Sequence, residues 1–209
     1  MKLAVVCANG KAGRLITDEA VKRGLDVTVI IRGENKTAAN KVITKDILDI
    51  KPEDLKGFDA VIDTFGAWTP DTLPMHSTSL KALCDAVSGT NTRLLVVGGA
   101  GSLYVNPEHT MTLSQTPDFP ESWQPLANAM AKALAELRER KDVKWTYISP
   151  AADFQADGAK TGKYILAGED FTLNADKQSY ISYADYAAAM IDEAVNGNHV
   201  NQRISVLAE

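Results

Sequence analysis

The 209-residue sequence is poor in residues that form disulfides or metal sites. It contains only two cysteines, Cys7 and Cys84, with no C-x-x-C motif. Both stand among apolar residues, so we expect free thiols and a cytoplasmic protein rather than a disulfide-stabilised one. The three histidines, His76, His109 and His199, are scattered. Because they lack the spacing of metal ligands, no metal site is expected.

Long apolar runs and excess positive charge are also lacking. No segment approaches the roughly 20 apolar residues that a membrane-spanning helix needs. The N-terminus lacks the charged and apolar regions of a signal peptide. The net charge of −5 argues against a nucleic-acid partner. We therefore expect no membrane or nucleic-acid partner. The length fits one domain over 1–209, without repeats or linkers.

The sequence does contain a regular alternation of short apolar runs and amphipathic segments. The apolar runs predict strands at 2–6, 26–31, 41–44, 59–64, 93–97, 144–148 and 203–207. Helical periodicity predicts helices at 12–23, 73–88, 123–141 and 183–195. A small hairpin is expected around Gly168, from 162–166 and 171–173. This order predicts an α/β fold, a Rossmann-type, doubly wound parallel sheet in three layers, formed by a single domain.

The first predicted strand leads into a glycine-containing turn, Cys7-Ala8-Asn9-Gly10-Lys11-Ala12-Gly13-Arg14. A strand–turn–helix of this kind can direct backbone N–H groups and the positive helix end at a phosphate. Gly10 would allow close backbone approach, and Gly13 would let the helix pack on the strand. The usual dinucleotide motif has three glycines, and Cys7 holds the first place here. An ordinary strand–helix turn, with Cys7 as a buried apolar residue, remains the alternative.

The second predicted strand is followed by basic residues. A free ribose 2′-hydroxyl usually meets an acidic side chain at this place, whereas a 2′-phosphate is matched by guanidinium and ammonium groups. Arg32 and Lys36 therefore favour NADP, with NAD possible, although a solvated basic loop is the alternative. Asp46, after the next strand, could accept from an adenine amino group or cap the following turn.

Small residues follow the strand predicted at 59–64. Thr64-Phe65-Gly66-Ala67 would leave room for a nicotinamide ribose, because ligands of open parallel sheets lie beyond the carboxyl ends of strands. Trp68 could form a wall of this pocket or could serve packing alone. Two long stretches without clear periodicity, at about 99–122 and 150–182, are expected to be substrate-side loops.

These stretches resemble the atypical short-chain dehydrogenases/reductases. The similarity is greatest to the NAD(P)H-binding group of NmrA-like proteins and biliverdin reductase B/flavin reductase, and especially to bacterial NADH-flavin reductases. It covers nearly the whole chain and rests on NGKAGR (9–14), VIIR (29–32), KDILD (45–49), LLVVGGAGSL (94–103), ISPAA (148–152) and ISYADYA (181–187). The resemblance implies cofactor contacts from Gly10, Lys11, Ala12, Gly13, Arg14, Arg32, Asp46, Ile47, Thr64, Phe65, Gly66, Ala67, Pro150 and Ala151.

The chain departs from that superfamily at its catalytic pair. In Tyr-x-x-x-Lys the lysine lowers the tyrosine pKa for proton transfer, but none of the six tyrosines here has a lysine four residues later. Asn128 stands four residues before Lys132, where the tyrosine would be. A carbonyl reductase or sugar epimerase of the usual kind is therefore disfavoured. Hydride transfer to a flavin needs no strong acid, since stacking and exclusion of water suffice.

The sequence thus predicts an NAD(P)H-dependent reductase acting on a flavin, bound as substrate, or on a similar flat acceptor. The catalytic candidates are Ser102 and Lys132, although each fits a plain structural or solvated role better. Candidates to line the acceptor site are Trp68, Tyr104, Trp123, Asp153 and Phe154, which could equally be core or surface residues. The alternatives are a non-catalytic NADP(H)-binding redox sensor and an isomerase or dehydratase with tightly held cofactor. We expect a monomer or weak homodimer.

Overall fold

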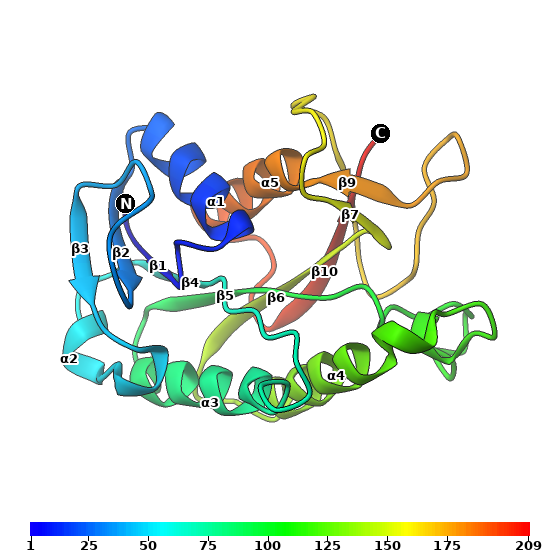
Figure 1. The fold of residues 1–209 in the computed structure, drawn as a ribbon, viewed down its shortest axis with the longest axis horizontal. Helices are drawn as coiled ribbons and strands as arrows, with labels where there is room; N and C mark the ends of the chain where they lie inside the picture. Colours follow the sequence, from blue (N-terminus) through cyan, green and yellow to red (C-terminus); the bar gives the residue numbers. More distant parts are fainter.

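A twisted eight-stranded sheet runs through the centre of the computed structural model, which describes all residues from 1 to 209 (Figure 1). The strand order is β3-β2-β1-β4-β5-β6-β10-β8. All neighbours pair in parallel except β8, which is antiparallel to β10. The strands are β1 (Lys2–Val6), β2 (Asp26–Ile31), β3 (Lys41–Thr44), β4 (Ala60–Asp63), β5 (Arg93–Val97), β6 (Lys144–Pro150), β8 (Ile165–Ala167) and β10 (Gln202–Leu207). Strands β7 (Asp153–Gln155) and β9 (Tyr180–Ser182) form a separate parallel pair.

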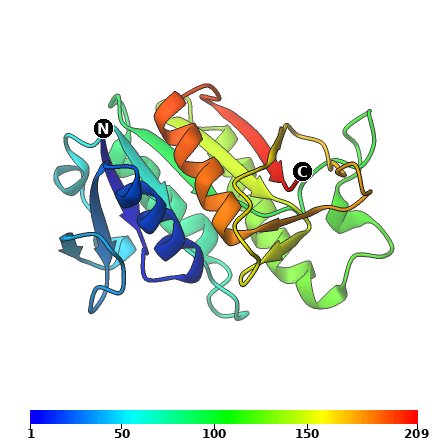
Figure 2. The same cartoon turned by 90° about the horizontal axis from the view of Figure 1, so that it is seen from above.

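Helices cover both faces of the sheet and create the predicted three layers. One face carries α1 (Lys11–Lys22) and α5 (Tyr183–Asn196), which lie side by side (Figure 2). The other carries α3 (Met75–Val87) and α4 (Gln124–Arg138), with the short α2 (Pro52–Leu55) beside them (Figure 1). None of these helices combines the length and apolar character required to cross a membrane.

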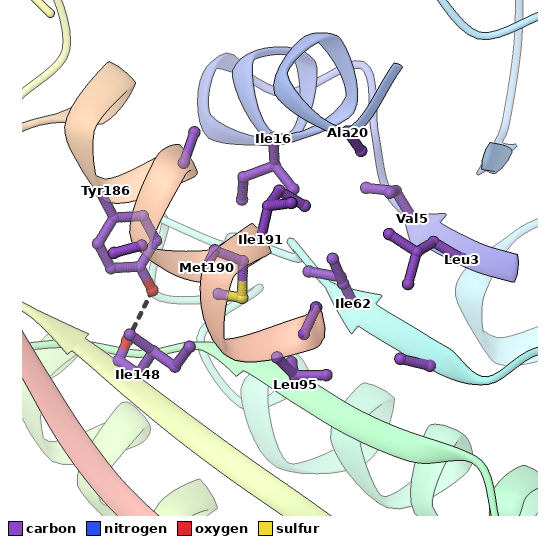
Figure 3. Packing of buried hydrophobic residues seen from close by; sticks show 14 of the residues in the cluster. Leu3, Val5, Ile16, Ala20, Ile62, Leu95, Ile148, Tyr186, Met190 and Ile191 are labelled. Carbon is purple, nitrogen blue, oxygen red and sulfur yellow. Dashed lines mark hydrogen bonds between the residues drawn. The ribbon is translucent and has the colours of Figure 1, made fainter. Parts of the chain in front are cut away.

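Each face of the sheet has its own apolar core. Leu3 and Val5 point towards α1 and α5, whereas Ala4 and Val6 point towards the opposite layer. Figure 3 shows helix residues packed over the strands, including Ile16 of α1. In the same view the Tyr186 hydroxyl donates to the Ile148 carbonyl at 2.6 Å. Burial on both faces explains why the strands read as continuous apolar runs rather than alternating ones.

The expected hairpin around Gly168 is wrong. Strand β8 pairs with β10, placing Ala167 opposite Ser205, and so extends the main sheet. Residues 171–173 form no strand; instead the Phe171 N–H donates to the Tyr104 carbonyl at 2.7 Å. The sheet is therefore mostly, rather than wholly, parallel. An antiparallel edge strand satisfies the backbone groups that β10 would otherwise leave open.

The two long connections are structured in part. The 99–122 stretch contains the 3-10 turns η2 (Leu113–Gln115) and η3 (Glu121–Trp123), while 150–182 contains β7, β8 and β9. A Cβ on Gly98 would come 2.3 Å from the Tyr147 ring, and one on Gly99 would come 2.9 Å from the Met130 sulfur. The first connection thus begins pressed against β6 and α4, a position that only glycine allows.

Candidate functional site

The segments singled out in the sequence converge at the carboxyl edge of the sheet. Strand β1 lies between β2 and β4. After β1 the chain passes to α1 on one face, whereas after β4 it passes to α3 on the other. In open α/β sheets, ligands bind at the carboxyl ends of the strands beside the point where the connections diverge in this way.

The turn after β1 presents an open backbone at the start of α1. Gly10 is the N-cap of the helix, and no side chain caps it. A Cβ on Gly10 would meet only the Cys7 carbonyl, at 3.6 Å, so a ligand can approach the backbone. Lys11 and Arg14 are exposed, and Ala12 is half-buried. Uncapped N–H groups and nearby positive charge are suited to a phosphate.

Gly13 fixes the helix against the sheet. A Cβ here would lie 2.6 Å from Thr64 Oγ1 and 2.8 Å from the Ala8 Cα, so the close packing expected at Gly13 is present. The Thr64 hydroxyl donates to the Val6 carbonyl at 2.7 Å. The turn and the end of β4 are therefore held as one unit.

Cys7 packs against the apolar core on the α3 side of the sheet, in keeping with its interpretation as an apolar residue. It is half-buried, and its φ of 59° lies in the left-handed region that favours glycine. Burial, with a smaller contribution from Asp63, raises the pKa of the thiol to about 12. Cys7 is thus a neutral thiol in the conformation that the usual first glycine supplies.

Asn9 brings the basic loop to the turn, a role that the sequence reasoning did not find. Its Nδ2 donates to the Glu34 carbonyl, and its Oδ1 accepts from the Lys36 N–H, both at 2.9 Å. The Arg32 side chain is 79% exposed and lies 3.5 Å from the Asp46 carboxylate, while Lys36 is exposed. Positive side chains therefore stand at the same edge as the phosphate-type turn.

Asp46 and Ile47 both stabilise the turn that follows β3. The Asp46 carboxylate accepts from the Leu48 N–H at 3.0 Å and so caps the 3-10 turn η1 (Ile47–Asp49), which is one of the two expected roles. Ile47 is buried in the core, with 4% of the residue exposed.

Two buried titratable groups hold the segment after β4, and neither was found from the sequence. Asp63 Oδ1 accepts from the Phe65 N–H at 2.9 Å, and His76 Nε2 lies 3.1 Å from the Ala67 carbonyl. Burial raises the pKa of Asp63 to about 6 and lowers that of His76. A neutral His76 must carry its proton on Nε2, since a carbonyl can only accept. The position of Asp63 at the end of an apolar run could have identified it from the sequence. His76 lies within α3, where no sequence pattern marks it.

Trp68 and Trp123 come together at the same edge. Their rings meet edge to face, with centroids 6.4 Å apart, although the chain separates them widely. Trp68 follows β4 and Trp123 precedes α4, and the residues are 65% and 52% exposed. Two exposed indoles provide apolar area for a flat ring.

The other acceptor-site candidates are engaged in different contacts. Tyr104 stacks on His109 with centroids 4.3 Å apart. The Phe154 ring packs on the Tyr183 ring with centroids 3.9 Å apart, and Phe154 is partly buried against the core. Asp153 is exposed and accepts from Gln155 Nε2. These contacts lie within the protein, and the assignment of the three residues to an acceptor site stays a prediction.

The catalytic candidates stand apart from the turn. Ser102 Oγ accepts from Arg203 Nη1 at 3.4 Å. The Lys132 side chain is 71% exposed and lies 3.8 Å from Glu136 along α4. Nothing in this geometry gives Lys132 access to a reacting group.

Two of the residues expected to contact the cofactor, Pro150 and Ala151, are buried at the end of β6.

The sequence profile of the NAD(P)H-binding family matches residues 7–195, starting at the first residue of the turn. The chain belongs to the NAD(P)H-binding family. This membership confirms the resemblance found in the sequence, and the Rossmann-type fold agrees with it.

Relatives of this NAD(P)H-binding protein match over its full length. YwnB of Bacillus subtilis (strain 168) is 42% identical, covering 100% of this chain and 99% of YwnB. A crystal structure from Streptococcus pneumoniae TIGR4, described as "a putative NADH-flavin reductase", is 55% identical with a TM-score of 0.98, covering 100% of both chains. Another from Bacteroides thetaiotaomicron, described as a "putative epimerase", is 34% identical with a TM-score of 0.86, covering 99% and 96%. The two descriptions differ in reaction, so the reaction must be argued from the site.

Proposed function

We propose that this protein is an NAD(P)H-dependent oxidoreductase that transfers hydride to a flavin, bound as substrate, or to a similar flat acceptor. The observation that carries the proposal is the meeting of an open phosphate-type turn and an exposed tryptophan pair at one edge of the sheet. The similar protein from Streptococcus pneumoniae, described as "a putative NADH-flavin reductase", supports the same class of reaction.

The residues at this edge fit a nicotinamide dinucleotide. Backbone N–H groups around Gly10 would hold the diphosphate. Arg32 and Lys36 would bind a 2′-phosphate, which favours NADP over NAD. The 64–67 segment, positioned by Asp63 and His76, would border the nicotinamide ribose. The bound cofactor supplies the hydride, and the chain orients it.

The absence of a tyrosine–lysine pair suits a flat acceptor. A flavin that receives hydride at N5 can take its proton at N1 from water, so the protein needs to stack the two rings and exclude solvent. Trp68 and Trp123 offer the stacking surface. Ser102 accepts from Arg203 and Lys132 faces solvent, and the proposal assigns a proton-transfer step to neither.

Steady-state turnover tests the proposal. The protein is mixed with NADPH or NADH and with FMN, FAD, riboflavin or a quinone, and the loss of reduced-nicotinamide absorbance is followed. We expect oxidation above the uncatalysed rate. Trp68→Ala should raise the KM for the acceptor several-fold while cofactor binding is kept, and Leu48→Ala, another exposed apolar residue, is the matched control.

Two outcomes would overturn the reductase proposal. Cofactor binding without turnover of any acceptor would favour the redox sensor that the sequence left open. Nicotinamide retained through purification would favour an isomerase or dehydratase.

A further inference from the structure

A basic cavity lies at the other end of the sheet from the proposed cofactor site. It has a volume of about 470 Å³ and is bordered by Arg138 at the end of α4, Trp145 near the start of β6 and Arg203 near the start of β10. The cofactor segments follow the carboxyl ends of strands, whereas this cavity adjoins the amino ends of β6 and β10. It is therefore a separate site.

The cavity gathers more positive charge than it neutralises. Four of its lining residues are cationic, and Glu169 is the single carboxylate among them, in a chain with a net charge of −5. Arg140 is paired with Asp85 and Asp142, each at 2.7 Å, neither of which lines the cavity. The other three cations, Arg138, Lys141 and Arg203, have Glu169 as the only negative residue of the lining to offset their charge. The lining thus has an excess of two positive charges.

Some of these cations are fixed in place and others have donors to spare. The Arg203 side chain is fully buried and is held by the Glu169 carboxylate and the Ser102 carbonyl. Arg138 uses only Nη2, which donates to both Glu169 oxygens at 2.7 and 2.9 Å. Its Nε and Nη1 are left free to donate. The Lys141 ammonium donates only to the Arg138 carbonyl, at 2.8 Å.

We propose that this cavity binds the phosphate group of a small phosphorylated molecule through Arg138 and Lys141. A phosphate dianion would balance the excess of two charges, which a monocarboxylate would not. The free Nη1 of the Arg138 guanidinium and the Lys141 ammonium can each donate a charge-assisted hydrogen bond to a phosphate oxygen. The volume lies within the range of small-molecule pockets, roughly 300–1,000 Å³, and exceeds what a phosphate group alone fills. Trp145 is the one hydrophobic lining residue, so a polar ligand is expected.

Trp145 provides a local reporter for this site. The chain has three tryptophans, so Trp68→Phe combined with Trp123→Phe leaves Trp145 as the only one. We would titrate this variant with inorganic phosphate and, separately, with acetate at matched ionic strength, and follow Trp145 fluorescence. Saturable binding of phosphate, with acetate at least about tenfold weaker, is the expected result. A response that is absent, or equal for both anions, would overturn the proposal.

Charge variants made in the same background separate specific binding from a general salt effect. Arg138→Gln and Lys141→Gln should each weaken phosphate binding about tenfold, as the loss of one charge-assisted hydrogen bond implies. Lys132→Gln, on the exposed face of α4 outside the cavity, should leave binding unchanged. Thermal melting confirms that each variant is folded. Equal phosphate affinity in all three variants would refute the assignment, whether or not the protein reduces flavins.

Discussion

Arg32 forms an exposed ion pair with Asp46 that a ligand phosphate could replace. The Arg32 guanidinium lies 3.5 Å from the Asp46 carboxylate, yet its side chain is 79% exposed. An exposed ion pair of this kind contributes only about 0–1 kcal/mol. A 2′-phosphate with more negative charge can therefore compete for the guanidinium. Asp46 keeps its own role, since its carboxylate also caps the turn that follows β3.

Arg32→Glu should weaken NADPH binding by tenfold or more and NADH binding far less. The variant removes a charge-assisted hydrogen bond worth about 1.5–3 kcal/mol and adds repulsion against the phosphate. Calorimetric titration with each coenzyme measures the difference. Lys22→Glu, in the last turn of α1 away from the phosphate-type turn, carries the same charge change as a control. Equal losses for the two coenzymes would remove the 2′-phosphate argument.

Asp63→Asn should make the protein more stable than wild type at neutral pH. Burial raises the pKa of Asp63 from 3.8 to about 6, so the folded state favours the protonated acid. Its stabilising contribution is fully present below pH 3.8 and is lost as the pH rises through 6. Asparagine stays neutral and keeps an oxygen for the Phe65 N–H. The gain should reach up to about 3 kcal/mol above pH 6.

Urea unfolding of this variant and of wild type across pH 4–8 measures the effect. The difference in unfolding free energy should shrink towards pH 4, where wild-type Asp63 is protonated. Asp71→Asn, at an exposed position, should show no such trend. A difference that stays constant with pH would contradict the assigned cause.

At the scale of elements, close contacts between successive units decide the geometry of the site. Ser182 caps α5, since its Oγ accepts from the Asp185 N–H at 3.0 Å. The Asp185 carboxylate does not complete a capping box. It accepts from the backbone N–H groups of Thr161 and Gly162, at 3.0 and 2.7 Å. Burial opposes its ionisation, but these hydrogen bonds outweigh burial and lower its pKa. One carboxylate thus ties a long connection to the start of a helix.

Gly13→Ala should destabilise the protein by about 1–3 kcal/mol and weaken cofactor binding. The added Cβ would lie within 2.9 Å of Thr64 Oγ1 and of the Ala8 backbone, and overpacking of this kind has that typical cost. Gly33→Ala is the control, because a Cβ there has nothing within 4 Å. Thermal melting and coenzyme titration of both variants provide the measurement. Similar behaviour of the two would show that the α1–β4 contact does not position the turn.

On the scale of the whole molecule, the two cores make the sheet a rigid platform and leave the ligand edges at the surface. Buried clusters on opposite faces fix β1, β4 and β5 from both sides. An ion pair between Arg93 and Glu193 joins the amino end of β5 to α5, and His199 also contacts that carboxylate. The turn, the tryptophan pair and the basic cavity therefore sit on a common frame.

NADPH should raise the melting temperature of the whole protein. A ligand that binds only the folded state stabilises it by about 2.7 kcal/mol when its concentration is one hundred times Kd. Differential scanning fluorimetry with NADPH, NADH and no coenzyme measures the shift, and NADPH should give the larger one at equal concentration. If neither coenzyme moved the transition, the proposed cofactor site would be wrong.

The sequence predicted the central strands better than the helix ends. The bounds of β1, β2 and β5 agree with the apolar runs, because burial on both faces leaves an uninterrupted signal. The bounds of β3 agree as well, although β3 is an exposed edge strand. The helix expected at 123–141 is three residues too long at its end, since α4 stops at Arg138 without a glycine signal. Strand β8 was paired wrongly because its partner β10 is distant along the chain.

The amino-acid sequence alone determined the layered α/β fold, the glycine turn and the edge at which a dinucleotide would bind. Those features depend on periodicity and on which residues follow each strand, and both are local properties. Only the tertiary structure brought Trp68 to Trp123, His76 to the Ala67 carbonyl, and Arg138 and Arg203 to one carboxylate. Such meetings depend on strand order and on how each crossover packs, which no local pattern encodes.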